Sequence, residues 1–349
     1  MSAVVSPAGR VTLKQGGGGR AMRTLIEKMF VRDFATLPFD GVGIAAMDDG
    51  AAVKIGDEWL VITTDSHVIH PIFFPGGDIG RLSICGTVND LAMMGATRVL
   101  GLTCSVILEE GFPIESLEAI QRSMMVACRE AHAPVVTGDT KVMGRRELDG
   151  IVINTCGIGL TRTLVRDNGL SAGDRIIVTG SIGEHGLAVM SARHGLEIEG
   201  DLVSDVAAMN SLIASILDDA TFVGAGHVTA MKDPTRGGVS SALHEMAQKS
   251  GVGIVIEERA VPVLPSVRAV GELLGIDPLH VANEGKALIG VRADAAEAVL
   301  ARLRAHPLGL QAAIIGTCVE ERPGSIVLDT GFGRRLLAEP EGEPLPRIC

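Results

Sequence analysis

Aromatic and basic residues are scarce in this sequence of 349 residues. It contains no tyrosine, one tryptophan and eight phenylalanines, and no run approaches the roughly eighteen consecutive apolar residues that a membrane-spanning helix needs. Lysine and arginine number 31 against 42 aspartates and glutamates, without a basic cluster, so the net charge of −11 would repel a nucleic-acid backbone. Residues 1–15 lack an apolar leader. We therefore expect a cytoplasmic protein that binds neither membranes nor nucleic acids.

Paired-cysteine motifs are also missing. The six cysteines show no C-x-x-C pattern and no cysteine–histidine cluster at the spacing of a zinc site. Five of them lie in apolar segments such as LSICGTV, where a cysteine usually acts as a small buried hydrophobic residue. Cys349 differs, because it is the last residue of a charged, proline-containing stretch, EPEGEPLPRIC.

Two common nucleotide-binding motifs are absent as well. No G-x-x-x-x-G-K-[ST] occurs, and the glycines at 16–19 do not follow a strand, so they do not make a Rossmann fingerprint. Glycine is nevertheless abundant, with 44 residues, as in sites whose backbone wraps closely around a phosphate. Any nucleotide site in this chain must therefore be of another kind.

Hydrophobic periodicity predicts an α/β (or α+β) protein with four parts. A glycine-rich arm and an amphipathic helix occupy 1–37, a first domain 38–160, a second α/β domain 161–335, and a flexible tail 336–349, because 338–349 carries three prolines and three glutamates. In the first domain we expect a helix that Ser116 caps. The expected strands there are 51–56, 58–65, 97–110, 133–142 and 150–160, and the expected helices are 82–96 and 116–131.

Acidic residues recur where apolar segments end. Asp49, Asp65, Asp90 and Asp139 each follow or interrupt an apolar run, where an unpaired carboxylate would be costly to bury. Each one alone is equally consistent with turn capping. Together they suggest a shared Mg²⁺–phosphate site, because Mg²⁺ is bound by a few carboxylates together with phosphate oxygens.

Two loops add to this prediction. KDPTRGGVS at 232–240 places Asp233 and two glycines directly before a helix, where free N–H groups and the helix dipole favour an anion. A helix cap with a tight turn explains this loop equally well. In VTGDTKV, Lys141 follows Asp139 by two residues, so its ammonium either shares the same pocket or is solvated.

Several motifs together resemble one protein family. They are HPIFFPGGDIGRLSICGTVNDLAMMGA at 70–96, PVVTGDTKV, IIVTGSIGEHGLAVM, KDPTRGGV, ANEGKAL and the final PRIC. The chain resembles, over nearly its whole length, the HypE family of hydrogenase maturation proteins, in the superfamily of aminoimidazole ribonucleotide synthetase, selenophosphate synthetase and thiamine-phosphate kinase. One position departs from the family, because Gln15 stands where a histidine usually precedes the glycines.

The resemblance implies a two-domain PurM-like fold. In that fold the first domains of two chains pair their strands into a barrel, ATP binds near the interface, and the second domain is α/β. The implied cofactors are ATP and Mg²⁺. The implied partners are a second copy of the chain, a HypF-like carbamoyltransferase, and a HypC–HypD-like scaffold complex that receives cyanide.

The resemblance also implies a reaction and its residues. An S-carbamoyl group on Cys349 is dehydrated to a thiocyanate at the expense of ATP, which supplies cyanide ligands for [NiFe] hydrogenase. Lys141 and Glu284 match polar residues that attend the bound tail, and one of them would accept the amide proton. The implied metal ligands are Asp49, Asp65, Asp90, Asp139 and Asp233, and the implied nucleotide-binding residues are these five with Asn89, Thr137, Gly138, Gly237 and Gly238.

Two other functions are considered beside this one. A kinase or synthetase of the same superfamily would act on a free small molecule, such as thiamine phosphate or selenide. However, selenophosphate synthetases carry their reactive cysteine or selenocysteine in the N-terminal arm, and this arm has none. A scaffold whose Cys349 holds a metal or forms a mixed disulfide would need no ATP and no aspartates at phosphate positions.

Overall fold

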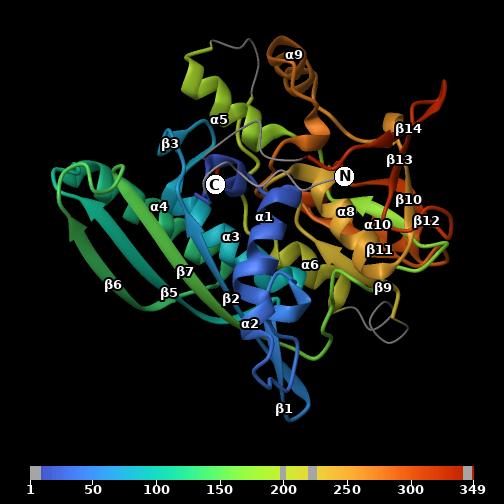
Figure 1. Ribbon diagram of the computed structural model, residues 1–349, viewed down its shortest axis with the longest axis horizontal. Coiled ribbons are helices and arrows are strands. Elements are labelled where there is room, and N and C mark those ends of the chain that lie inside the picture. Colours follow the sequence, from blue (N-terminus) through green and yellow to red (C-terminus); the bar gives the residue numbers. More distant parts are fainter. Residues whose placement is uncertain (1–8, 197–201, 219–225, 341–347) are drawn as a thin grey trace.

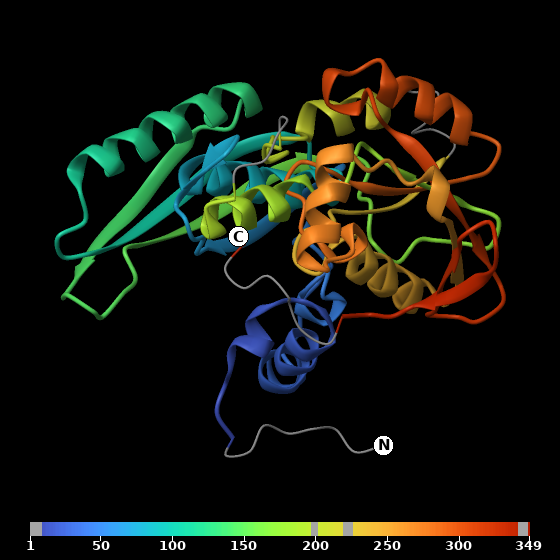
Figure 2. The same ribbon diagram turned by 90° about the horizontal axis from the view of Figure 1, so that it is seen from above.

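The computed structural model describes residues 9–196, 202–218, 226–340 and 348–349. Two β-sheets lie side by side, each covered by helices, and the end of the chain lies between them (Figures 1 and 2). The predicted α/β class is therefore confirmed. Neither sheet closes into a barrel within the single chain.

The first sheet has five strands in the order β1-β2-β7-β5-β6, all antiparallel to their neighbours except β5 and β6. Its strands match the predicted ones, and β6 is an edge strand with every residue exposed. Helix α3 packs against β2 and β7, and α4 packs against α3. The bounds are β1 Ala51–Ile55, β2 Glu58–His67, β5 Arg98–Glu109, β6 Val135–Met143, β7 Ile151–Thr161, α3 Ile79–Met93 and α4 Ile114–Ala131.

Both helices of this domain begin earlier than predicted. Asp78 caps α3, because its Oδ1 accepts hydrogen bonds from the backbone N–H groups of Gly80 (2.7 Å) and Arg81 (3.1 Å). The prediction that Ser116 caps α4 is wrong, since the helix starts at Ile114 and its N-cap residue is Pro113. The extended backbone of Pro113 (φ −65°, ψ 128°) leads directly into the helix, and its carbonyl accepts the first helical hydrogen bond, from the N–H of Leu117 at 3.1 Å, so Ser116 already lies inside the helix.

The second sheet has seven strands in the order β14-β13-β10-β12-β8-β11-β9, in which only β10 and β13 run parallel. Its strands are β8 Arg175–Val178, β9 Val228–Lys232, β10 Gly253–Glu257, β11 Leu288–Val291, β12 Ala313–Val319, β13 Ile326–Asp329 and β14 Arg334–Leu337. Its helices are α5 Glu184–His194, α6 Asn210–Leu217, α8 Gly238–Ser250, α9 Pro265–Leu274 and α10 Ala296–Arg304.

Several elements were not predicted. They are α6, β9, β14 and the small hairpin of β3 (Phe73–Phe74) and β4 (Gly77–Asp78). Short helical turns η3 (Ile44–Ala46), η4 (Glu258–Ala260), η5 (Pro278–His280) and η6 (Pro307–Gly309) also connect the longer elements.

The N-terminal arm forms a helical segment on one side of the two sheets (Figure 2). It comprises η1 (Leu13–Gly16), α1 (Gly19–Ile26), the π-helical η2 (Glu27–Val31) and α2 (Arg32–Phe34). Among the described residues, no helix combines the length and the apolar character needed to span a membrane.

The described residues of the expected flexible tail contact other parts of the chain at both ends. Strand β14 continues to Leu337, and the next residues lie against the arm and α8: Ser240 Oγ donates to the carbonyl of Ala338 at 3.0 Å, and Arg23 pairs with Glu339 at 2.5 Å. Ile348 is 1% exposed. The predicted flexibility of 341–347 falls outside the described residues.

Candidate active site

A pocket of about 670 Å³ lies where the two sheets, α3, α8 and the N-terminal arm meet. Among the sequence-predicted site residues it brings together Asp49, Asp65, Asp90, Asp233, Glu284 and Cys349. These residues come from positions as far apart as 49 and 349, so the fold gathers them from both domains and the tail.

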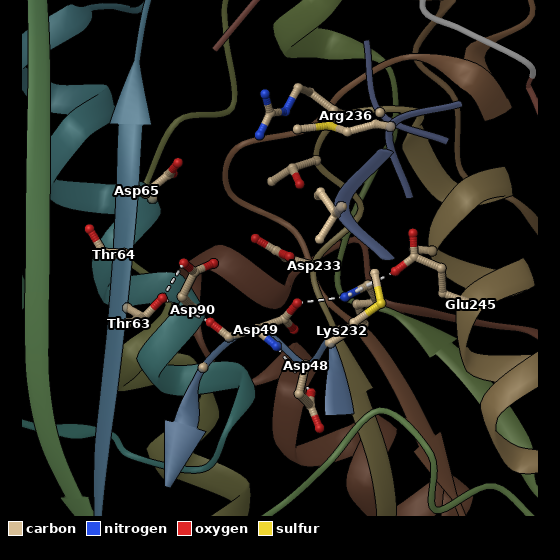
Figure 3. A pocket seen from close by; sticks show the side chains of 18 of the residues that line it. Asp48, Asp49, Thr63, Thr64, Asp65, Asp90, Lys232, Asp233, Arg236 and Glu245 are labelled. Carbon is tan, nitrogen blue, oxygen red and sulfur yellow. Dashed lines mark hydrogen bonds and ion pairs between the residues drawn. The ribbon is translucent and has the colours of Figure 1, made fainter. Parts of the chain in front are cut away.

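Four aspartates face one another across this pocket (Figure 3). Asp49 precedes β1, Asp65 lies on β2, Asp90 on α3, and Asp233 directly follows β9. Thr63 Oγ1 lies 2.8 Å from both Asp90 Oδ2 and the carbonyl oxygen of Asp49, which ties the helix to the loop. Asp65 and Asp90 come from separate elements and lie on the same side of the pocket, opposite Asp233 (Figure 3).

The aspartates impose an unfavourable electrostatic environment on one another. Burial raises the pKa of Asp90 well above its usual range, and the charges of Asp233 and Asp65 raise it further. Burial and the charge of Asp49 likewise raise the pKa of Asp233 to about 8, although Lys232 opposes this. The pocket therefore holds more carboxyl groups than its own cations can keep ionised.

The pocket fits a divalent cation shared with a phosphate. Asp49 Oδ2 is buried and has no hydrogen-bond partner, while Oδ1 is bound by Lys232. Such an unpartnered carboxylate oxygen among crowded aspartates is suited to a hard cation such as Mg²⁺. In the described part of the chain no three acidic, histidine or cysteine side chains form a complete metal cluster by themselves, so phosphate oxygens would have to complete the coordination.

Lys232 is a site residue that the sequence analysis did not assign. Its Nζ lies 2.5 Å from Asp49 Oδ1, 3.4 Å from Glu245 and 3.7 Å from Asp167 (Figure 3). It ends strand β9 and is only 9% exposed, so burial alone would lower its pKa, and the neighbouring carboxylates more than reverse this. The sequence feature that could have indicated Lys232 as a site residue is its position at the end of an apolar segment, directly before Asp233 and a proline.

Glu284 lies in the same pocket and is only 3% exposed. Its Oε1 is buried without a hydrogen-bond partner, and burial, together with Asp233 and Asp65, raises its pKa well above the usual range. Asp205 holds the backbone here, because its two oxygens accept from the N–H groups of Glu284 (3.1 Å) and Gly285 (3.2 Å). The side chain is thus positioned by its backbone and keeps a free oxygen.

Asn89 does not line the pocket, but its side chain is hydrogen-bonded to the backbone of Glu284 and of residues 207 and 209. Its Nδ2 donates to the carbonyl oxygens of Ala207 (3.0 Å) and Glu284 (3.1 Å), and its Oδ1 accepts from the N–H of Met209 (2.8 Å). The side chain is 2% exposed. Its observed role is therefore to position Glu284.

The structure does not bring the β6 residues into this pocket. Thr137, Gly138, Asp139 and Lys141 are exposed on the edge strand, and none of them lines the pocket of the same chain. Lys141 lies 3.0 Å from Asp139 and lowers the pKa of that carboxyl. The expected common pocket for these residues and the other aspartates is not formed within one chain, because β6 ends the sheet.

The glycine turn before α8 lies beside the pocket. Gly237 and Gly238 have φ values of +83° and +63°, and a Cβ on Gly237 would lie 2.1 Å from Ser241 Oγ, so the turn needs glycine there. Thr235 and Arg236 line the pocket, whereas these two glycines do not.

Gln15 does not line the pocket. Its Oε1 accepts hydrogen bonds from the backbone N–H (2.8 Å) and the hydroxyl (2.6 Å) of Thr12. Its observed interactions are therefore with the N-terminal arm itself.

Comparison with known proteins covers both domains. Residues 47–161 match the N-terminal domain of the AIR synthase related proteins, and residues 171–329 match their C-terminal domain. The carbamoyl dehydratase HypE of Rhizobium leguminosarum bv. viciae is 46% identical over 344 residues, which cover 98% of this chain and 95% of that protein.

Solved structures agree with this similarity. A chain in the crystal structure of a HypE–HypF complex has a TM-score of 0.82 at 42% identity, covering 90% of this chain and 99% of that one. The crystal structure of hydrogenase maturation protein HypE in complex with ATP has a TM-score of 0.78 at 41% identity, covering 97% and 99%. Thiamine monophosphate kinase from Aquifex aeolicus, at 16% identity with a TM-score of 0.64 and coverage of 89% and 98%, shares the fold alone.

Proposed function

This chain belongs to the HypE family of carbamoyl dehydratases, and from that membership we propose that it converts an S-carbamoyl group on its own Cys349 into a thiocyanate using ATP. The observation that carries the proposal is the place of Cys349, which lines the same pocket as Glu284 and the aspartates. The residue that would carry the substrate and the aspartates that would bind Mg²⁺ and phosphate thus line the same pocket of one chain. The alternative of a kinase acting on a free small molecule has only the shared fold in its favour.

The chemistry requires both ATP and a proton acceptor. Hydroxide is a poor leaving group, so the thiocarbamate oxygen takes the γ-phosphoryl group of ATP while the nitrogen loses one proton. Departure of phosphate with loss of the second N–H proton then closes the C≡N bond and leaves the sulfur–carbon bond of Cys349 intact. The products are the thiocyanate, ADP and phosphate, and each N–H proton needs a base within hydrogen-bond reach.

The pocket residues divide these tasks between them. Asp49, Asp65, Asp90 and Asp233 would hold Mg²⁺, which when bound neutralises charge on the phosphates during transfer. Lys232 fixes Asp49 through Oδ1 and leaves Oδ2 without a partner, so that this oxygen is available to a cation. Glu284, with its unpartnered Oε1 and raised pKa, is the residue we assign as acceptor of the second N–H proton.

Mass spectrometry of the C-terminal peptide tests this function. The protein is incubated with a HypF-like carbamoyltransferase, carbamoyl phosphate and ATP, and we expect a carbamoyl adduct on Cys349 that becomes a thiocyanate only when ATP and Mg²⁺ are both present. Omission of ATP and addition of EDTA are the two controls. An unmodified Cys349, or conversion without ATP, would contradict the proposal.

The proposed partners follow from the same chemistry. A HypF-like carbamoyltransferase loads the thiol, and a solved HypE–HypF complex exists for a related chain. A HypC–HypD-like scaffold complex would then accept the cyanide. Adding that complex after the conversion should return Cys349 to the free thiol in the same mass spectra, and a thiocyanate that persists would exclude the transfer.

We further propose that a second copy of the chain completes the site through β6. This edge strand is exposed along its whole length, with Val136 64% and Val142 68% exposed, and such an edge is usually covered in a stable protein. Pairing of β6 with the other copy would form the shared barrel and place Asp139 and Lys141 at the interface. Lys141 would then act beside the bound tail, and Asp139 would join the metal ligands.

Charge introduced on this edge should separate the dimer. We expect Val136→Lys to sediment as a monomer at micromolar concentration and to lose dehydration, because the lysine would be buried without a partner at the interface. Val126→Lys on α4, at a valine that is 46% exposed, is the matched control and should remain dimeric. A dimer that persists in Val136→Lys would place the interface elsewhere.

A further inference from the structure

His185, at the start of α5, connects the second domain to the end of the chain. The imidazole is fully buried; its Nδ1 lies 2.8 Å from Ser204 Oγ and its Nε2 lies 2.8 Å from the carbonyl oxygen of Ile348. Ser204 Oγ also accepts from the backbone N–H of Val206 at 3.1 Å. The hydroxyl proton of Ser204 is therefore available to Nδ1, and Nε2 carries the proton that is donated to Ile348.

We propose that His185 and Ser204, with the apolar cluster around Ile348, form a receptor for the chain end that positions Cys349 for dehydration; this proposal rests on the proposed function. Ile348 is 1% exposed and belongs to the same buried cluster as Phe74 and Val206. The ring of Phe74 meets the imidazole edge-on, with 5.4 Å between the ring centroids. One apolar side chain and one carbonyl of the tail are thus recognised together, directly before the reacting sulfur.

The same segment that binds His185 also fixes Glu284. Ser204 is followed by Asp205, whose carboxylate accepts from the N–H groups of Glu284 and Gly285 and pairs with Lys286 at 3.3 Å. A Cβ on Gly285 would lie 2.0 Å from the carbonyl oxygen of Asp205, so the two backbones are in direct contact. Residues 204–205 therefore set the position of the Ile348 carbonyl relative to the carboxylate that receives the proton.

This receptor also allows the chain end to be released from His185, which loading of Cys349 by the transferase requires. Its described contacts hold only the last two residues, while Ser240 and Arg23 hold the tail at Ala338 and Glu339. Release at His185 thus removes the contact of Ile348 while the contacts of Ala338 and Glu339 beside β14 remain. The transferase then has access to the thiol, and the loaded thiol returns to a defined position.

Alkylation of Cys349 measures docking independently of any chemistry with ATP. Full-length protein is treated with iodoacetamide, without nucleotide or transferase, and labelling of the C-terminal peptide is followed by mass spectrometry. We expect His185→Ala to be labelled about tenfold faster than the wild type, the effect of one net hydrogen bond, and His185→Gln to return toward the wild-type rate because its Nε2 restores the donor. Labelling of Cys128 on α4 in the same sample reports general opening of the fold.

Further variants separate docking from damage to the fold. Ile348→Ala changes only the tail and should also speed labelling of Cys349, whereas His306→Ala, at a hydrogen-bonded histidine outside the pocket, should not. In single turnover of the carbamoylated protein, His185→Ala should be slowed and His185→Gln largely restored. Wild-type labelling in His185→Ala, or equally fast labelling in His185→Ala and His185→Gln, would overturn the receptor. A wild-type protein that protects Cys349 but never forms thiocyanate would contradict only the proposed function.

Discussion

Glu284→Gln is expected to lose dehydration by about 10³-fold while binding ATP normally, because the substitution keeps the shape of the side chain and removes the base. The wild-type carboxyl is buried with a free Oε1 and a raised pKa, so once ionised it is a stronger base than an exposed glutamate. The amide of glutamine cannot accept the proton. The loss should therefore appear in the chemical step and leave nucleotide affinity unchanged.

Single-turnover kinetics of the carbamoylated protein measure this prediction. Thiocyanate formation is followed by mass spectrometry after ATP is added, and ATP affinity is measured by calorimetry on the same variant. Glu297→Gln, at an exposed residue of α10 outside the pocket, is the matched control and should react at the wild-type rate. A Glu284→Gln protein that dehydrates normally would remove Glu284 from the role of base.

Lys141→Ala is the companion variant. We expect it to lose dehydration as well if the second copy of the chain brings Lys141 to the bound tail. Normal turnover in both Lys141→Ala and Glu284→Ala would exclude both residues as proton acceptors and leave the mechanism without either proposed base.

The hydrophobic pattern of the sequence indicated those site residues that are polar but lie within buried apolar segments. Asp90 lies in an apolar helix and Asp65 on a strand, and their positions within apolar segments indicated that they needed a compensating ligand. The structure gathers them with Asp49 and Asp233 in one pocket. Most strands and helices were likewise predicted from the periodicity of apolar residues and from the turn residues between them.

Interactions between distant segments could not be predicted in this way. Nothing in the sequence of 133–142 tells that β6 lies at the edge of its sheet, so Asp139 was expected beside the other aspartates, with Lys141 either in the same pocket or solvated. The family resemblance implied Asn89 as a nucleotide-binding residue, yet its amide binds loops more than a hundred residues away. His185 had no recognisable role because its partner, Ile348, lies 163 residues further along the chain.

One glycine appended after Cys349 is expected to slow dehydration by about 100-fold, the scale of effect that a displacement of about 1 Å produces at a reacting atom. His185 holds the carbonyl of Ile348, and Ile348 is buried, so the chain end cannot shift outward to make room without losing this contact. The added residue would have to lie in the pocket beside Glu284 and the aspartates, where its carboxylate would meet negative charge. The alternative is that the tail stays undocked, and Cys349 is then labelled faster by iodoacetamide.

Two measurements distinguish these outcomes from a failure to load the thiol. Carbamoylation by the transferase is quantified first, so that dehydration is compared per loaded cysteine, and ATP affinity should equal that of the unextended protein. Faster alkylation of Cys349 together with slow dehydration would show that the receptor accepts only a chain that ends at this residue. Wild-type turnover in the extended protein would show instead that the pocket leaves room beyond Cys349, so that docking depends on Ile348 and His185 alone.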